Sequence, residues 1–182
     1  MSGSDHAVGH GTESGAATRR PLPLYTPEQR RRRDATPWTL VQGVLAPAQF
    51  LAFLISLILV VRTLVAGHGL WAASVSVVIK TLFLYAIMVT GAIWEKRVFD
   101  RYLFAPAFYW EDVFSMLVIG LHTAYLVALF TGWLGARDQL LLALAAFATY
   151  VVNAGQFLLK LRAARLDEKR ASALTPLQGV TS

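Results

Sequence analysis

The stretch FLAFLISLILVV, residues Phe50–Val61, decides the fold class of this chain. Eleven of its twelve residues are apolar and only Ser56 is polar. A strand of a membrane β-barrel would alternate apolar and polar side chains over about 10 positions, and neither this stretch nor Leu140–Ala148 alternates. Both stretches therefore predict helices that are apolar on every face.

Four such apolar runs occur in the chain. A helix needs about 20 residues to cross the ~30 Å hydrocarbon layer of a bilayer. A soluble domain of 182 residues, 55% of them apolar, could not bury runs of this length in its own core. The sequence predicts an all-α integral membrane four-helix bundle, with spans at about Leu40–Val65, Leu70–Trp94, Val113–Leu134 and Leu140–Leu161.

The connections between the spans predict the topology. Tight turns at residues 67–69 and 135–138 make the helices on either side antiparallel. The longer middle connection, Glu95–Asp112, is rich in aromatic residues, and Pro106 prevents one continuous helix. Aromatic rings collect at the lipid–water boundary, so we expect an interfacial segment here, between the second and third helices.

Basic residues predict the orientation and the ends of the domain. Fourteen lysines and arginines lie before the first span, in the middle connection, and at or beyond the end of the fourth span. The positive-inside rule then predicts that both termini are cytoplasmic. The net charge of +6 indicates contact with anionic lipid rather than with nucleic acid. We expect a disordered polar head (1–23), one transmembrane domain (24–166) and a flexible cytoplasmic tail (167–182).

Two ionisable residues lie near the middle of predicted spans, where they are costly and are often functional. At this depth Lys80 must have a polar partner, be deprotonated, or face a water-filled cavity. Alternatively, it is a structural lysine whose ammonium extends toward the membrane surface. His122 can be the axial ligand of a metallated tetrapyrrole, or it can only hydrogen-bond a neighbouring helix. A single histidine is no zinc site, and the absence of cysteine excludes thiolate metal sites and disulfides.

Three carboxyl groups mark the cytoplasmic boundary: Glu95 ends the second span, and Glu111 and Asp112 begin the third. Such carboxyl groups can act as general acids or bases, although they can also only cap a helix start or pair with nearby cations. Other polar residues fall at helical spacing on inward faces, and any one of them can simply join helices. They are Ser115 with Glu111 and His122, Tyr85 with Glu95, and Asn153 with Gln156 and Lys160.

Long strings of the chain resemble the 3-vinyl bacteriochlorophyllide hydratases of photosynthetic bacteria. The resemblance covers about Tyr25 to Leu166 and leaves out the glycine-rich head and the tail. It is carried by LYTPEQR (24–30), PWTLVQGVLAP (37–47), VIKTL (78–82), MVTGAIWEK (88–96), YLFAPAF (102–108), WEDVFSM (110–116), LHTAY (121–125) and NAGQFLLK (153–160).

The resemblance implies a hydro-lyase of bacteriochlorophyll biosynthesis in an inner membrane, cytoplasmic or photosynthetic. It would add water to the C3-vinyl group of a chlorophyllide and give a 1-hydroxyethyl group. The implied reaction requires no cofactor from the protein. The central magnesium of a chlorophyllide is part of the substrate. Lipid and other pigment-synthesis enzymes are the further partners we expect.

The chemistry of hydration suggests roles for the residues. An acid must protonate the vinyl end, and a base or polar group must position water. We expect Glu95 or Glu111 as the acid, and Asp112 or Glu95 to orient water. The expected substrate-binding residues are His122 on the magnesium or ring, Lys80 or Arg97 on the propionate, Trp110 at the entrance, and Tyr85, Asn153 and Gln156.

Two other classes remain open from the residues alone. A small four-span transporter would also carry Lys80 and His122 inside its spans, but the halves show no internal repeat. A non-catalytic pigment-binding or assembly protein would bind a tetrapyrrole through His122 without converting it. Incubation with a 3-vinyl chlorophyllide would distinguish the carrier from the enzyme.

Overall fold

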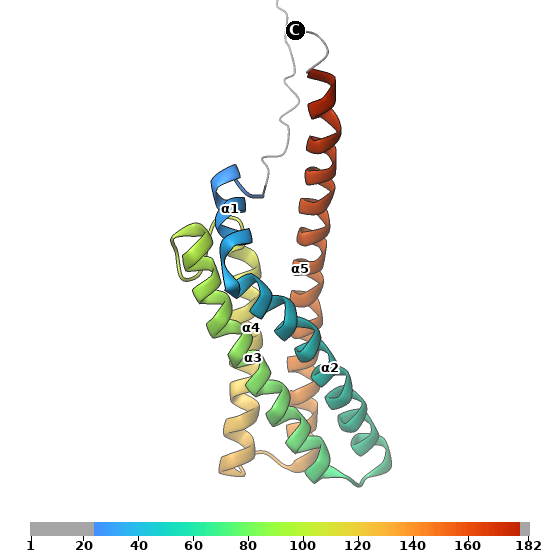
Figure 1. The fold of residues 1–182 in the computed structure, drawn as a ribbon. Helices are drawn as coiled ribbons and strands as arrows, with labels where there is room; N and C mark the ends of the chain where they lie inside the picture. The colour runs from blue at the N-terminus through green and yellow to red at the C-terminus, as the bar shows by residue number, and fades with distance from the viewer. Residues whose placement is uncertain (1–23, 179–182) are drawn as a thin grey trace, which may run out of the picture.

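The structure is a computed structural model that describes residues 24–178, and every regular element in this range is a helix. The elements are α1 (Pro27–Ala35), α2 (Pro37–Ala66), α3 (Leu70–Phe99), α4 (Tyr109–Thr131) and α5 (Ala136–Gln178). Figure 1 shows α2 to α5 side by side along one axis, with α1 at one end, which we call the α1 end. The predicted head (1–23) and the end of the predicted tail (179–182) lie outside the described residues.

Four of these helices are long and apolar enough to cross a membrane: α2, α3, α4 and the part of α5 up to Leu166. Their most apolar windows have mean hydropathies between 1.6 and 2.5. Large apolar side chains also cover the outside, as at Val65 and Phe130, which are 84% and 77% exposed. The predicted all-α fold with four helices long and apolar enough to span a membrane is therefore confirmed.

The bundle consists of two antiparallel hairpins. The most extensive packing is within the pairs α2–α3 and α4–α5, and contacts of α2 with α5 and of α3 with α4 close the bundle. Gly67 and Gly69 in the first turn and Gly132 after α4 have φ angles of 72°, 95° and 66°. These left-handed conformations suit glycine: Gly67 and Gly132 follow the ends of α2 and α4, and Gly69 precedes the start of α3.

Helix α1 was not predicted, because its sequence PEQRRRRDA has no apolar face. Its start is fixed by a capping box, in which the Thr26 hydroxyl accepts from the Gln29 amide and the Gln29 side chain accepts from the Thr26 amide. Thr36 is extended, as is usual before a proline, and separates α1 from α2.

The element boundaries differ from the predicted ones mainly at the middle connection and at α5. Helix α3 continues through Glu95 to Phe99, so the irregular part is only residues 100–108. Helix α5 extends past the predicted span to Gln178 and includes most of the segment expected to be a flexible tail. Apolar periodicity does not mark these ends, because charged residues continue a helix as readily as apolar ones.

Candidate active site

The three carboxyl groups predicted as catalytic lie together at the α1 end. Glu95 comes from α3, and Glu111 and Asp112 from the first turn of α4. The Glu95 and Asp112 carboxyl groups are within hydrogen-bonding distance, and Glu111 is near enough to act on both electrostatically. All three are buried, with exposures of 6%, 6% and 3%.

The loop of residues 100–108 covers this carboxyl cluster and is held by it. The Phe104 amide donates to Asp112 Oδ2 at 2.7 Å, and the Ala105 amide donates to Glu95 Oε2 at 3.4 Å. Phe104 has a φ of 58°, a conformation that is unfavourable for a bulky residue unless its surroundings hold it. Two of the cluster's carboxyl groups thus satisfy loop amides rather than the amides of a helix start.

Lys160 of α5 completes the cluster on the side of Glu111. Its Nζ donates to Glu111 Oε2 at 2.6 Å and to the Ala107 carbonyl, and it lies 5.1 Å from the centre of the Phe108 ring. The sequence places Lys160 on a polar stripe of α5 but does not identify this ion pair. Only the packing of α5 against α4 shows it.

An aromatic cluster closes the α1 end around the loop. Tyr25 stacks on Phe99 with ring centres 5.8 Å apart, and Phe108 stacks on Phe157 at 5.9 Å. Trp94 meets Phe108 edge-on at 5.8 Å. Tyr25 and Phe108 are buried, so these rings exclude water from the loop side of the carboxyl cluster.

Asn153 and Gln156 of α5, both predicted to bind substrate, lie close to the same cluster. Asn153 Nδ2 donates to Ser115 Oγ at 2.9 Å, and Ser115 lies one turn beyond Glu111 on α4. Gln156 lies one turn before Lys160 on α5. The polar stripe on α5 therefore faces the acidic start of α4.

Lys80 and His122, also predicted to contact the substrate, pair with each other. Lys80 Nζ lies 2.6 Å from His122 Nε2, while His122 Nδ1 lies 2.8 Å from the Val118 carbonyl and donates to it. Both residues are fully buried, and Lys80 Nζ is 4.2 Å from the centre of the Tyr150 ring. Both ring nitrogens of His122 thus have protein partners, and the prediction that it ligates magnesium remains a prediction.

The pair also lies far from the carboxyl cluster. His122 follows Glu111 by eleven residues on α4, which corresponds to about 16 Å along the helix axis. Tyr85 has a similar bridging position, since its hydroxyl is 2.7 Å from Thr123 Oγ1. Trp110 is 66% exposed on the outside of α4.

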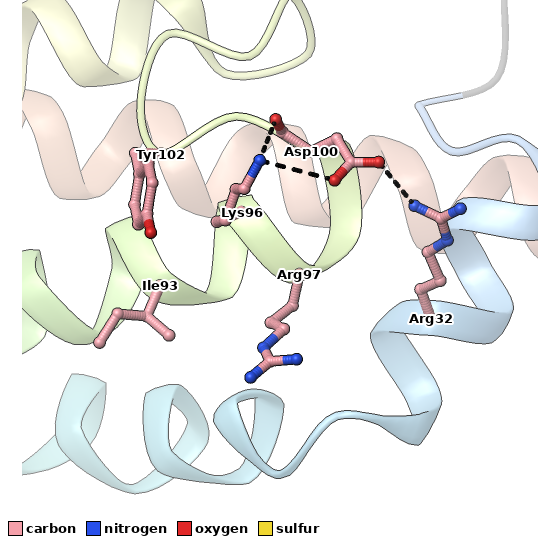
Figure 2. A pocket seen from close by; sticks show the side chains of 6 residues that line it. All are labelled: Arg32, Ile93, Lys96, Arg97, Asp100 and Tyr102. Atoms are coloured by element: carbon pink, nitrogen blue, oxygen red, sulfur yellow. Dashed lines mark hydrogen bonds and ion pairs between the residues drawn. The ribbon is translucent and has the colours of Figure 1, made fainter.

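Arg97, predicted to meet the propionate, lines a pocket of about 480 Å³ at the α1 end. Figure 2 shows its six lining residues, which come from α1, α3 and the loop: Arg32, Ile93, Lys96, Arg97, Asp100 and Tyr102. Asp100 accepts from Arg32 at 3.2 Å, and its backbone carbonyl accepts from Lys96 at 3.0 Å. The hydrogen bonds that the Arg32 guanidinium donates to Glu28 and Asp100 raise its pKa, so it remains charged.

Within residues 24–178, Arg97 makes no hydrogen bond or ion pair. The pocket therefore holds three cationic side chains against one carboxylate and favours an anion. Residues 95 and 97 point about 200° apart around a helix. The carboxyl cluster and the Arg97 pocket thus lie on different faces of α3.

The site can supply acid–base chemistry in a place from which water is largely excluded. It combines the neighbouring carboxyl groups of Glu95 and Asp112 with the Glu111–Lys160 ion pair. The side-chain amides of Asn153 and Gln156 lie close by. In the described part of the chain, no group of three or more histidine, aspartate or glutamate side chains is arranged to hold a metal ion.

Comparison with known proteins identifies the family. The model of the 2-vinyl bacteriochlorophyllide hydratase family matches residues 25–163. A protein of this name from Rhodobacter capsulatus is 68% identical over 152 residues, covering 84% of this chain and 88% of the relative. Another from Cereibacter sphaeroides is 68% identical over 148 residues, covering 81% and 92%.

This chain belongs to the 2-vinyl bacteriochlorophyllide hydratase family. The family resemblance seen in the sequence is thus confirmed, although the family description numbers the vinyl position 2 rather than 3. No solved structure matches the chain.

Proposed function

We propose that this membrane protein adds water to the vinyl group of a bacteriochlorophyllide precursor and gives a 1-hydroxyethyl group. Its membership of the family, with 68% identity to two relatives named as hydratases, is the observation that carries this function. The carboxyl cluster at the α1 end supplies groups of the kind that hydration requires. The protein contributes no cofactor to this reaction, and the central magnesium is part of the substrate.

Glu95 is the acid that protonates the terminal vinyl carbon. Two carboxyl groups in contact hydrogen-bond only when one carries a proton, and Glu95 faces Asp112 in this way. Glu111 instead accepts from the Lys160 ammonium, which suits a carboxylate. The contacts therefore favour Glu95 over Glu111 as the acid and leave Glu111 to accept a proton.

The pigment reaches Glu95 when the loop of residues 100–108 is displaced. The loop's own amides occupy the Glu95 and Asp112 carboxyl groups. Aromatic residues of the loop and of α4, including Phe104 and Trp110, are exposed and line the way in from the lipid boundary. Closure over the bound ring would then exclude bulk water.

The Arg97 pocket receives the substrate's free carboxylate. Its excess of cationic side chains and the unpaired state of Arg97 among the described residues support this assignment. The ring would then lie across the end of α3, with its vinyl group toward Glu95. The α1 end faces the cytoplasm of an inner membrane, as the clustering of basic residues there indicates.

Purified protein incubated with a vinyl bacteriochlorophyllide precursor tests the function. We expect the absorption band to shift as the vinyl group leaves conjugation, and the product to gain the mass of one water. Binding of the pigment without either change would instead identify a carrier.

A further inference from the structure

Two amide side chains on α5 have buried carbonyl oxygens that accept no hydrogen bond from residues 24–178. They are Oδ1 of Asn153 and Oε1 of Gln156. Asn153 is only 8% exposed, and its Nδ2 is already engaged with Ser115. A buried acceptor left without a donor destabilises the fold, so a pair of them on one helix face indicates a ligand that supplies the missing donors.

Asn153 forms one of two bridges that join α4 and α5, and Gln156 lies between these bridges along α5. One bridge is the hydrogen bond from Asn153 to Ser115, and the other is the ion pair of Lys160 with Glu111. Gln156 follows Asn153 by three residues and precedes Lys160 by four, so all three share one face of α5. That face is directed at the turn of α4 that runs from Glu111 to Ser115.

A ligand for this place must donate two hydrogen bonds and be small enough to fit between packed helices. A water molecule meets both requirements, and its oxygen keeps a lone pair for another bond. A metal cation is disfavoured, because the Lys160 ammonium is adjacent and already neutralises Glu111.

We propose that Asn153 and Gln156 hold the water molecule that is added to the substrate, an assignment that rests on the proposed function. The proton of Glu95 and the π electrons of the vinyl group form a new C–H bond at the terminal carbon. The cation formed at the inner carbon is delocalised into the macrocycle. The water oxygen then forms the C–O bond there while Glu111 takes one water proton, and proton transfer from Glu111 to Glu95 resets the site.

Deuterium exchange separates the water site from the acid. The reaction is run in D₂O with wild type, Asn153→Leu and Gln156→Met, and both the hydrated product and the recovered vinyl substrate are analysed by mass spectrometry. We expect each variant to lose hydration by at least about 10²-fold. Each should still place deuterium on the terminal vinyl carbon, since the cation loses a proton again when no water is held beside it.

Thr149→Val is the matched control, because it removes a side-chain hydrogen bond from α5 one turn before Asn153. It should hydrate like wild type, whereas Glu95→Gln should lose hydration and exchange together. Unchanged hydration in both amide variants would overturn the assignment, and so would a parallel loss of hydration and exchange. If wild type itself gave no hydration, the proposed function would be overturned and this assignment with it.

Discussion

A single neighbour distinguishes the carboxyl groups of this site from one another. Glu111 meets the ammonium of Lys160 at 2.6 Å, whereas Glu95 meets the carboxyl group of Asp112 and the amide of Ala105. The three residues look equivalent in the sequence, since all lie at the ends of apolar runs. Their partners across the bundle give them different chemistry.

Glu95→Gln should reduce kcat for hydration by at least about 10²-fold, the usual contribution of a general acid. Glutamine keeps the shape and can still donate to Asp112, but it has no acidic proton to transfer. Turnover is measured from the absorption change in detergent-solubilised protein.

Asp138→Asn is the matched control for this change, because Asp138 is an exposed carboxylate in the first turn of α5, at the other end of the bundle. It should leave kcat within twofold of wild type, because Asp138 lies away from the carboxyl cluster. Equal activity of the Glu95 variant and wild type would remove Glu95 as the acid.

The buried pair of Lys80 and His122 should act on stability. His122→Leu leaves Lys80 Nζ buried without its hydrogen-bond partner and should cost about 1–3 kcal/mol of unfolding free energy. Lys80→Met leaves the buried His122 Nε2 without a donor and should also cost about 1–3 kcal/mol of unfolding free energy. The double variant should be more stable than His122→Leu alone, as measured by thermal unfolding followed by circular dichroism. Wild-type stability with a raised KM in the single variants would indicate contact with the substrate instead.

At the scale of elements, α3 contributes one residue to each of three polar sites. It carries Lys80 into the bundle core, Glu95 into the carboxyl cluster and Arg97 into the pocket shared with α1. Because these positions point in different directions around one helix, a rigid α3 fixes their relative places. The proposed binding of the pigment across its end depends on that rigidity.

Arg97→Gln should raise KM for the free-acid pigment about fivefold, because a charged hydrogen bond at an accessible site contributes ~1 kcal/mol. The methyl ester of the same pigment should show no difference between variant and wild type, since it has no anion for Arg97. Arg101→Gln, a change at a neighbouring exposed arginine outside the pocket, serves as control. An equal effect of Arg97→Gln on acid and ester would contradict carboxylate binding and point to lipid contact or folding.

The apolar elements could be predicted from the sequence and the polar contacts could not. Long runs such as Phe50–Val61 require a helix, and the left-handed glycines at 67 and 132 end helices for a local reason. Helix α1 depends on a capping box and on packing against α3, which no apolar pattern signals. The rotation of each helix decides that Lys80 meets His122 and Lys160 meets Glu111, and rotation is set by tertiary packing.

At the scale of the whole molecule, charge and apolar surface together indicate how the bundle lies in a membrane. Arg32, Lys96, Arg97 and Arg101 all lie at the α1 end, around the loop and the pocket. The turn of residues 67–69 at the opposite end carries no lysine or arginine. This asymmetry favours a cytoplasmic α1 end.

Single cysteines should report this orientation without background, because the natural chain contains none. We expect a membrane-impermeant maleimide to label His68→Cys in intact spheroplasts. Arg101→Cys should be labelled only after the membrane is opened. Labelling of both positions before lysis, or the reverse pattern, would contradict cytoplasmic termini.

The bonds from Phe104 and Ala105 to the carboxyl cluster have a consequence for affinity. The pigment and the loop of residues 100–108 compete for the Glu95 and Asp112 carboxyl groups. Only molecules with a displaced loop bind pigment, so the measured dissociation constant equals the constant of the open form divided by the fraction of molecules that are open. A chain with a severed or shortened connection between α3 and α4 should therefore capture pigment more tightly than wild type. It should also let bulk water reach the cationic intermediate. The pigment would then enter more easily, but the new carbinol carbon would form with less stereoselectivity.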